Sequence, residues 1–407
     1  MSLLPSALLD GIRKDCPACL ERIHFNNAGA ALPPQVVTDT IVDYLQREAK
    51  VGGYELAGME AEVINDFYPA AAALLQAEPH QIAWATSATE AFNLAISSIL
   101  WEAGDIILTT KSDYISNQLI FLQLQKRRGV QVEILPEGKQ GYDPEGLEQR
   151  LKTGPRPKLL SITHIPTNSG RVQDIVAGGQ LARQYDLLYI VDACQSVGQL
   201  PIDVQTIQCD FLCATTRKYL RGPRGGGLLY VSQAVLDRGL APLGLDMHSA
   251  NWTGPDSFEA RADAKRFETW ERSAAIVKGA TAAIRYLLQF NQQQLSDHHC
   301  QLSSLLWEEI AALPRARMVD MPGKGWTRGS ANSGLVLADF PGADLDPDQL
   351  LRQLRQEGLN VFYSTLAGDQ HHFRERGVKW ALRASVHYYN SKEEVAKAGS
   401  LLRKYLS

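Results

Sequence analysis

The sequence lacks three features that would direct it to a membrane, the secretory route or a polyanion. No apolar run reaches the roughly 18 residues of a membrane-spanning helix. Its start, MSLLPSALLDGIRKDCPACL, has no basic segment ahead of a long apolar core, so a secretory signal is not expected. The net charge is only -4, which gives no reason to expect nucleic acid or an anionic membrane as partner. We therefore expect a cytoplasmic protein that acts on small molecules.

Cysteine is also scarce, with six residues in 407, too few for a disulfide framework. Cys194, Cys209 and Cys213 lie in or beside apolar segments typical of strands, which favours a reduced setting. The pair in CPAC, Cys16 and Cys19, resembles half of a zinc or redox site. A structural zinc needs four ligands, and strand cysteines are poor candidates for the other two, so we predict no metal. The histidine pairs at 298–299 and 371–372 are expected to be solvated helix or loop residues.

The order of apolar segments predicts an α/β fold. From about residue 80 to 232, short apolar runs such as QIAWAT, KLLSITHI and LLYIVDA alternate with helical stretches. Several runs are apolar at consecutive positions, which is typical of parallel strands covered on both faces. After residue 255 the pattern changes to long helices and a smaller α+β unit. We predict an amino-terminal segment (1–20), a large domain with a mostly parallel sheet (21–255) and a small α+β domain (256–407).

Polar side chains follow four of the predicted strands, and ligands of such sheets bind beyond the carboxyl ends of the strands. Each group alone has an ordinary explanation, because a strand-end aspartate often caps a helix and a lysine in a glycine-rich turn is usually solvated. The groups are Ser87, Ala88 and Thr89; His164, Thr167 and Asn168; Asp192 and Gln195; and Thr215, Arg217 and Lys218.

Together these groups are complementary to pyridoxal phosphate. The amine of Lys218 can form a Schiff base with an aldehyde, and Asp192 can keep a pyridine nitrogen protonated. Small residues and a hydroxyl at the start of a helix, as at 87–89, can hold a phosphate. Arg217 and Arg221 are expected to keep Lys218 neutral by like-charge repulsion.

The same segments resemble the cofactor site of class V aminotransferases, the family that includes cysteine desulfurases. VDACQSVGQLPIDV is followed by ATTRKYLRGPRGGG, and TSATEAFNLA resembles the family's phosphate loop. FNNAGAALPP resembles the family's amino-terminal substrate loop. RFETWERSAA resembles a segment that reaches the neighbouring subunit's phosphate, and LRASVHYYNSKEEV resembles the family's terminal arginine motif. The resemblance implies the fold type I of pyridoxal-phosphate enzymes and a homodimer with the active site at the interface.

The resemblance also implies a role for each matching residue. Lys218 is the Schiff-base lysine, Asp192 the partner of the ring nitrogen, and Gln195 a contact of the phenolic oxygen. Arg383 binds the substrate carboxylate, a bidentate task suited to guanidinium. The phosphate is assigned to Ser87, Ala88, Thr89 and Thr215, with Arg217 as an added cation nearby, and the substrate loop to Asn27 and Ala28.

The sequence departs from the family at two positions beside the ring. Tyr114 stands where a histidine usually stacks, and it offers a flat ring without imidazole acid–base chemistry near neutral pH. Thr167 stands where many members have asparagine, with Asn168 next to it. Tyr54, in the segment KVGGYELAG, is either part of a flap beside the substrate or part of a surface turn.

The reaction class follows less directly from the sequence. Cysteine desulfurases place a sulfur-accepting cysteine shortly before the carboxylate-binding arginine, and residues 355–382 contain none. The segments around Tyr54, Tyr114 and Lys218 look most like the C–S lyase branch. We therefore expect β-elimination on cysteine, cystine or an S-substituted cysteine or its sulfoxide, with a class V aminotransferase or epimerase as the alternative. A non-catalytic nucleotide binder is disfavoured, since no G-x-G-x-x-G follows the first strand.

Overall fold

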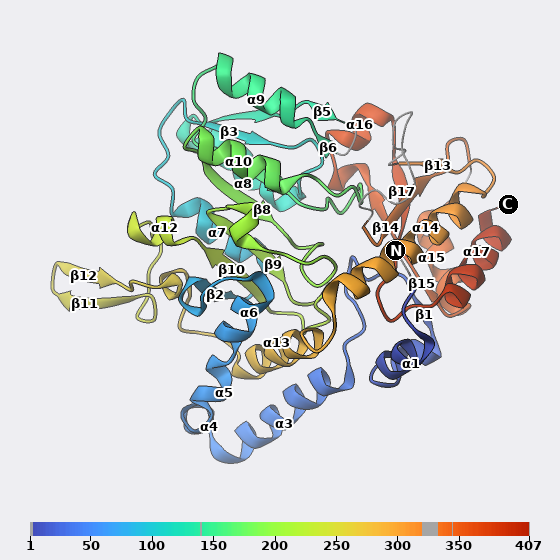
Figure 1. Cartoon of the computed structure of the whole chain (residues 1–407), viewed down its shortest axis with the longest axis horizontal. Helices are drawn as coiled ribbons and strands as arrows, with labels where there is room; N and C mark the ends of the chain where they lie inside the picture. Colours follow the sequence, from blue (N-terminus) through green and yellow to red (C-terminus); the bar gives the residue numbers. More distant parts are fainter. Residues whose placement is uncertain (1–2, 139–140, 320–332, 344, 407) are drawn as a thin grey trace.

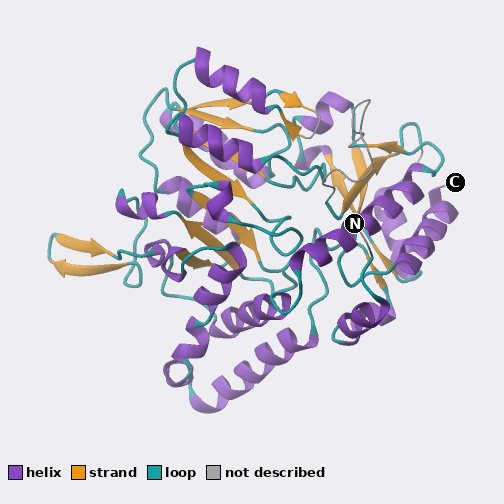
Figure 2. Ribbon diagram, viewed as in Figure 1, coloured by secondary structure: helices purple, strands orange, loops and turns teal. Residues whose placement is uncertain are grey.

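The chain folds around two β-sheets, a larger one of seven strands and a smaller one of four (Figures 1 and 2). The computed structural model describes residues 3–138, 141–319, 333–343 and 345–406. The larger sheet has the order β2-β10-β9-β8-β7-β3-β4. Its strands are β2 (Ile82–Ala85), β3 (Ile106–Thr109), β4 (Gln131–Ile134), β7 (Leu159–Thr163), β8 (Leu188–Asp192), β9 (Phe211–Thr215) and β10 (Gly227–Val231).

Most strands of the larger sheet are parallel. β4, β3, β7, β8 and β9 pair in parallel, whereas β10 is antiparallel to both of its neighbours. Parallel neighbours end at the same edge of a sheet, so Thr163, Asp192 and Thr215, the last residues of β7, β8 and β9, lie along one edge. This edge carries the polar groups that the sequence analysis singled out.

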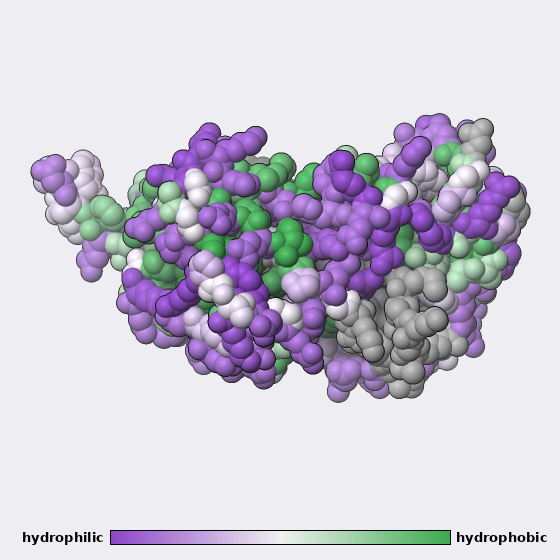
Figure 3. Space-filling model, turned by 90° about the horizontal axis from the view of Figure 1, so that it is seen from above, coloured by the Kyte–Doolittle hydropathy of each residue, from purple (hydrophilic) through white to green (hydrophobic). Residues whose placement is uncertain are grey.

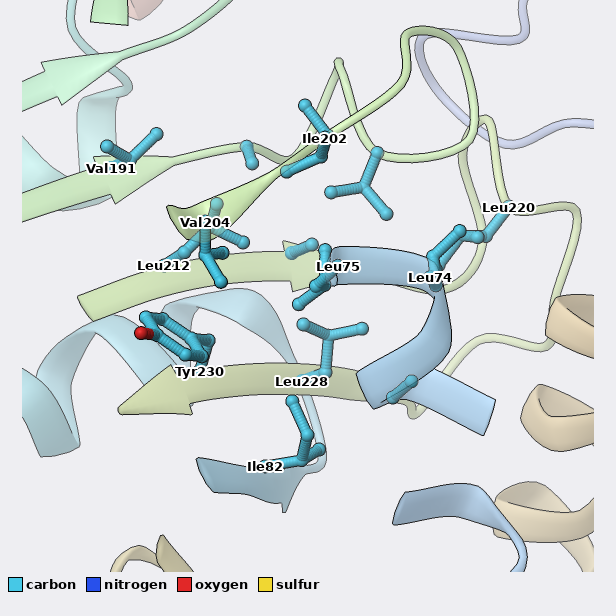
Figure 4. Close-up of a cluster of buried hydrophobic side chains, with 14 of the residues drawn as sticks. Leu74, Leu75, Ile82, Val191, Ile202, Val204, Leu212, Leu220, Leu228 and Tyr230 are labelled. Atoms are coloured by element: carbon cyan, nitrogen blue, oxygen red, sulfur yellow. The ribbon is translucent and has the colours of Figure 1, made fainter. Parts of the chain in front are cut away.

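The central strands are buried on both faces, which explains their consecutive apolar residues. Val191 of β8 packs into one core and Ile190 into the other. Figure 4 shows Leu74, Leu75, Leu212 and Leu228 among the side chains of the first core. The helices of that core include α6 (Phe67–Leu75), α9 (Pro144–Thr153), α10 (Ile175–Gln184) and α13 (Ala274–Leu287). Those of the second include α7 (Ala88–Ser97), α8 (Ile115–Arg128) and α12 (Gln233–Asp237).

The smaller sheet has the order β13-β14-β17-β16 and is packed by three helices. Its strands are β13 (Arg317–Met318), β14 (Leu335–Asp339), β16 (Phe362–Thr365) and β17 (Trp380–Ser385), and its helices are α14 (Gln292–Ala311), α15 (Pro347–Gln356) and α17 (Lys392–Leu406). Near the amino terminus, β1 (Ile23–His24) pairs with β15 (Leu359–Asn360), and Phe25 joins this core. The division at residues 20/21 and 255/256 stays a prediction.

The remaining elements are short, apart from α3 (Gln35–Val51), which packs along α13. A hairpin of β11 (Ala250–Gly254) and β12 (Ser257–Ala260) projects from the body of the molecule (Figures 1 and 3), with Trp252 and Phe258 exposed. The others are α1 (Ser6–Lys14), α2 (Ala18–Glu21), α4 (Gly53–Met59), α5 (Ala61–Asn65), η1 (Pro79–Gln81), β5 (Glu137–Gly138), β6 (Gly141–Tyr142), α11 (Val204–Ile207), η2 (Ala264–Phe267), η3 (Leu366–Gly368) and α16 (His372–Arg376).

The structure corrects the expectation that the histidine pairs are solvated. His298, His299 and His372 are buried, and only His371 is exposed. His298, on α14, accepts a hydrogen bond from the Leu4 backbone, which ties this helix to the amino-terminal segment. Within the described ranges, no three histidine, cysteine or acidic residues are grouped as metal ligands would be. In those same ranges, no helix has the length and apolarity needed to cross a membrane.

Candidate active site

A pocket opens where β7, β8 and β9 end, and it collects most of the residues that the sequence predicted. They come from separate parts of the chain because each follows its own strand. The lining residues are Ser87, Ala88, Thr89, Tyr114, Thr163, Ile165, Thr167, Asp192, Cys194, Gln195, Thr215, Arg217 and Lys218.

Lys218 lies in the turn that joins β9 to β10. The turn is closed by the Gly222 N–H, which donates to the Thr216 carbonyl at 2.8 Å, and the Lys218 side chain is buried. Burial lowers the pKa of Lys218, because a charged ammonium loses its hydration there. The charges of Arg217 and Arg383 lower it further, while Asp192 acts in the opposite direction. The side chain is therefore suited to supply a neutral, nucleophilic amine.

The expectation that Arg221 also repels Lys218 is wrong. Arg221 adopts a left-handed backbone conformation with φ of 60°, and its guanidinium points into an aromatic cluster. It lies 4.7 Å from the ring centre of Tyr389 and 5.1 Å from that of Tyr388. Arg383, from β17, provides the second like charge beside Lys218 instead.

Asp192 ends β8 and is held by hydrogen bonds to both carboxylate oxygens. The Cys194 backbone N–H donates to Oδ1 at 2.9 Å, and Asn117 Nδ2 donates to Oδ2 at 3.0 Å. Its backbone carbonyl accepts from the His164 N–H at 2.9 Å. These contacts fix the carboxylate in the pocket that Lys218 also lines, where it can pair with a protonated ring nitrogen.

A second buried carboxylate, Asp113, supports the first. Asn117 Nδ2 donates to Asp113 Oδ1 at 2.9 Å as well as to Asp192, so one amide links the two. Thr109 and Thr163 also donate to Asp113, at 2.7 and 2.5 Å. Burial raises the pKa of Asp113 to about 6, with the charge of Asp192 contributing. The Tyr114 backbone N–H also donates a hydrogen bond to Asp113, at 2.7 Å. Asp113 is therefore a positioning residue for Asn117 and Tyr114.

Tyr114 occupies the position just before α8. Its ring lies beside the lysine, with Nζ of Lys218 at 5.7 Å from the ring centre. This distance and the pocket lining are consistent with a ring that covers one face of a flat ligand.

The start of α7 forms one end of the pocket. The Ser87 hydroxyl caps this helix by accepting from the Glu90 N–H at 3.1 Å, which leaves the first backbone N–H groups of the helix available to an anion. Gly227 of β10 allows the close approach, because a Cβ there would lie 2.8 Å from the Ala88 nitrogen. The geometry fits a phosphate at Ala88 and Thr89.

A chain of polar contacts connects the pocket to the small sheet. Nη1 of Arg383 donates to the Thr167 hydroxyl at 2.7 Å, and Gln195 Nε2 donates to the same oxygen at 3.0 Å. Gln195 Nε2 also donates to the Ala28 carbonyl at 3.1 Å. Buried polar atoms normally have partners, yet Oε1 of Gln195 and Nε of Arg383 have none. A bound cofactor and a substrate carboxylate can provide the missing hydrogen-bond partners of these two atoms.

Five predicted residues do not line the pocket, and two of them, Ala28 and Arg383, contact the lining residues Gln195 and Thr167. The Asn168 amide turns away and donates to the Gly368 carbonyl at 2.9 Å, so only Thr167 faces inward. Asn27 is buried, and its amide donates to the Ser385 carbonyl at 2.6 Å, which holds the amino-terminal loop against β17. Tyr54 is 81% exposed on α4, at the end of α3, and does not reach the pocket of its own chain.

Sequence reasoning missed four residues of the site. Thr163 and Ile165 line the pocket on either side of His164, as alternation along an extended segment would have indicated. Asn117 lies three residues after Tyr114, on the same face of a helix. Cys194 comes two residues after Asp192, but its apolar neighbours suggested a plain buried thiol.

An α/β fold that brings a buried lysine, a buried aspartate and a helix start to one pocket is typical of a pyridoxal-phosphate enzyme. Residues 23–397 match the Aminotransferase class-V family, and the chain belongs to that family. This membership confirms the predicted class of enzyme and its cofactor, pyridoxal phosphate.

Relatives and solved structures agree with this assignment. A probable cysteine desulfurase of Pyrococcus abyssi is 25% identical over 397 residues, which is 95% of this chain and 94% of the relative. One from Synechocystis is 26% identical over 402 residues, 94% of this chain and 92% of the relative. The apo structure of a cysteine desulfurase from Thermococcus onnurineus superposes with a TM-score of 0.87 at 22% identity, covering 100% of this chain and 99% of that chain.

A further solved structure is that of a cystine C–S lyase in complex with its reaction product, cysteine persulfide. It gives a TM-score of 0.82 at 22% identity, covering 95% of this chain and 99% of that one. These likenesses confirm the predicted fold, the fold type I of pyridoxal-phosphate enzymes.

The lowered pKa of Lys218 has a measurable consequence. Burial makes the amine neutral at a lower pH than the ordinary pKa of 10.5 would. The rate at which the apoprotein takes up pyridoxal phosphate should therefore rise with pH with a midpoint below 10.5. The measurement is the gain in visible absorbance after adding the cofactor at a series of pH values. A midpoint at 10.5 or above would contradict this environment for Lys218.

Proposed function

We propose that this protein is a C–S lyase that removes the sulfur substituent from cysteine, cystine or an S-substituted cysteine by β-elimination. The observation that carries the proposal is the pocket itself, which Lys218 and Asp192 both line and to which Arg383 is joined through Thr167. The relatives named cysteine desulfurase and the cystine C–S lyase of the same fold support C–S bond cleavage as the reaction.

Each side chain has a role that its geometry permits. When bound, pyridoxal phosphate supplies an aldehyde for a primary amine and a ring that withdraws electrons from the substrate's Cα. Asp192 holds the ring nitrogen in its protonated form, and the start of α7 holds the phosphate. Lys218 would hold the cofactor through its amine, and the same amine is placed to take the proton from Cα as general base.

Arg383 is proposed to bind the substrate's α-carboxylate. Its guanidinium is buried, and this burial lowers its pKa to about 10. Its Nε has no hydrogen-bond partner. A carboxylate would accept from Nε and a terminal nitrogen together, the geometry in which arginine binds best. This contact would fix the orientation of Cα relative to Lys218.

The position of the cysteines favours elimination over sulfur transfer to the protein. The segment between β16 and β17, which precedes Arg383, contains no cysteine. Of the six cysteines, all of which lie in described ranges, only Cys194 lines the pocket, and its backbone is fixed to Asp192. No thiol on a loop before Arg383 is present to accept sulfur, so the released sulfur compound should leave as a free product.

Replacing Arg383 by lysine tests the carboxylate contact. The charge remains but the bidentate fork is lost, so we expect KM for the amino acid to rise about 100-fold with a smaller change in kcat. The measurement is steady-state kinetics, with Arg376→Lys as control, since Arg376 donates to the Val319 carbonyl outside the pocket. Equal KM values for both variants and the wild type would show that Arg383 does not bind the substrate.

The reaction class is tested by the products. The holoenzyme is incubated with cysteine, cystine and cysteine sulfoxides, and pyruvate and ammonia are measured with and without a keto-acid acceptor. We expect both products without acceptor. A strict requirement for acceptor would instead identify a class V aminotransferase, and loss of optical activity without pyruvate an epimerase; either result would reject the lyase.

The quaternary structure and location remain predictions of the sequence. A homodimer with the site at the interface would give the exposed Tyr54 and the projecting β11–β12 hairpin a partner surface. In that arrangement Tyr54 would reach the partner's pocket rather than its own. The cytoplasmic location rests on the composition of the sequence and its scarce cysteines.

A further inference from the structure

The amino-terminal pair Cys16 and Cys19 takes no part in the pocket. Both are buried, and both are free thiols. The Cys19 N–H donates to the Cys16 carbonyl at 3.0 Å, and Pro17 between them has helical angles of -53° and -34°. Residues three apart on one helical turn share a face, so the two sulfurs lie together. The Cys19 thiol donates to the Arg13 carbonyl at 3.6 Å, and the Cys16 thiol donates to the Pro33 carbonyl at 3.4 Å.

Arg221 is the buried cation behind this pair. Its side chain is 0% exposed, Nε donates to the Leu32 carbonyl at 2.8 Å, and Nη1 donates to the Tyr388 hydroxyl at 3.1 Å. Its Nη2 has no hydrogen-bond partner, which is costly for a buried charge. The groups whose charge acts on Arg221 are two tyrosine hydroxyls and the Cys16 thiol. Of these, the thiol ionises most readily, so Cys16 is the available counter-ion.

The electrostatics of the pair follow from these contacts. The neighbouring Cys19 side chain and the charge of Arg221 outweigh burial and lower the pKa of Cys16 to about 6. The same coupling and burial raise the pKa of Cys19. At neutral pH the pair therefore holds one thiolate and one thiol, the combination from which a disulfide forms most readily.

A surface cavity gives this pair access to small molecules. Cys19 lines it, together with cations such as Arg22 and Lys397 and carboxylates such as Glu393. Charges of both signs around a thiol suit a small disulfide that carries ammonium and carboxylate groups. The cavity lies beside α2 and α17, apart from the pocket that contains Lys218, since the two share no lining residue.

We propose that Cys16 and Cys19 form a redox-active dithiol that exchanges with low-molecular-weight disulfides. The thiolate of the pair attacks one sulfur of the disulfide, which forms a mixed disulfide and releases one thiolate. That thiolate takes the proton of the remaining cysteine, whose sulfur then attacks the mixed disulfide and releases the second thiolate, which is protonated by water. Two protein thiols are oxidised, and one small disulfide is reduced to two thiols.

The pair is connected to the active site through Arg221. The Arg221 N–H donates to the Lys218 carbonyl at 2.9 Å, so both residues belong to one turn. Arg221 also holds the Leu32 carbonyl, and the Ala31 N–H donates to the Arg217 carbonyl at 2.9 Å. Oxidation removes the thiolate and leaves the buried charge uncompensated, which weakens the turn. The redox state of the pair would in this way affect how firmly Lys218 is positioned.

The test uses the holoenzyme and bis(2-hydroxyethyl) disulfide, which has no amino group and so cannot be turned over as an amino acid. After incubation the protein is unfolded, its thiols are alkylated, and the peptides are mapped by mass spectrometry. We expect Cys16 and Cys19 joined in one peptide, the other four cysteines alkylated, and full reversal by dithiothreitol. Alkylation of both Cys16 and Cys19, or a disulfide that joins other cysteines, would overturn the proposal.

Two variants separate exchange from general oxidation. In Cys19→Ser the resolving thiol is missing, so a stable hydroxyethylthio adduct should accumulate on Cys16. In Cys209→Ser, which removes another buried cysteine, the Cys16–Cys19 disulfide should form as in the wild type. An unmodified Cys16 in the folded Cys19→Ser protein would reject Cys16 as the thiolate. Because the assay reports only thiols, its outcome is independent of the proposed lyase reaction.

Discussion

Lys218→Ala should abolish turnover and remove the visible absorbance of the purified protein. The side chain provides both the covalent attachment of the cofactor and the base for the Cα proton, so we expect kcat/KM to fall by about 10⁴-fold or more. The measurements are the absorbance spectrum after purification with added pyridoxal phosphate and the rate of pyruvate release. The fold should survive, because a smaller apolar side chain replaces a buried amine without adding volume.

Two further variants make this result specific. Lys218→Arg keeps a positive charge but cannot form the attachment at neutral pH, and it should be as inactive as the alanine variant. Lys126→Ala, at an exposed position near the end of α8, should retain wild-type absorbance and rate. Substantial turnover by Lys218→Ala would mean that another residue performs the chemistry.

Asp192→Asn should give the second-largest loss. The amide has nearly the shape of the carboxylate, but it cannot balance a protonated ring nitrogen, and one of its atoms would face the donors from Asn117 or Cys194. We expect kcat to fall by about 10²- to 10³-fold, in the range seen when a preorganised electrostatic contact is removed. Steady-state kinetics and a titration of the apoprotein with the cofactor measure the effect.

The control for this variant is Asp174→Asn. Asp174 is also an aspartate beyond a strand of the large sheet, but its side chain caps α10 by accepting from the Ala177 N–H at 2.9 Å. It lies outside the pocket and should show near wild-type activity. If both variants behaved alike, Asp192 would have no special role in holding the ring nitrogen.

The main site residues could be predicted because they lie directly after strands. The apolar runs that end at Asp192 and Thr215 fix two neighbouring parallel strands, and the topology of such sheets brings the carboxyl ends of those strands to one edge. Lys218 and the start of α7 lie at that edge for the same reason, since Lys218 follows β9 and α7 follows β2. The sequence therefore contained both the sheet and the chemistry of its carboxyl ends.

Side-chain direction was harder to predict from sequence. Arg221 lies only three residues from Lys218, but its left-handed backbone turns the guanidinium into a cluster of tyrosines. Asn168 and Thr167 are adjacent, and only the contact with Gly368 decides which one faces the pocket. His299 is buried because α14 packs against the small sheet, a long-range contact that polar character alone does not reveal.

The central claim is a covalent bond between Lys218 and pyridoxal phosphate beside Asp192, and borohydride reduction followed by peptide mapping tests it most directly. Reduction of the holoenzyme makes the bond permanent, and mass spectrometry then locates the phosphopyridoxyl group. The structure requires that group on the peptide that contains Lys218. Its attachment to a different lysine, or an unlabelled protein after saturation with the cofactor, would contradict the account.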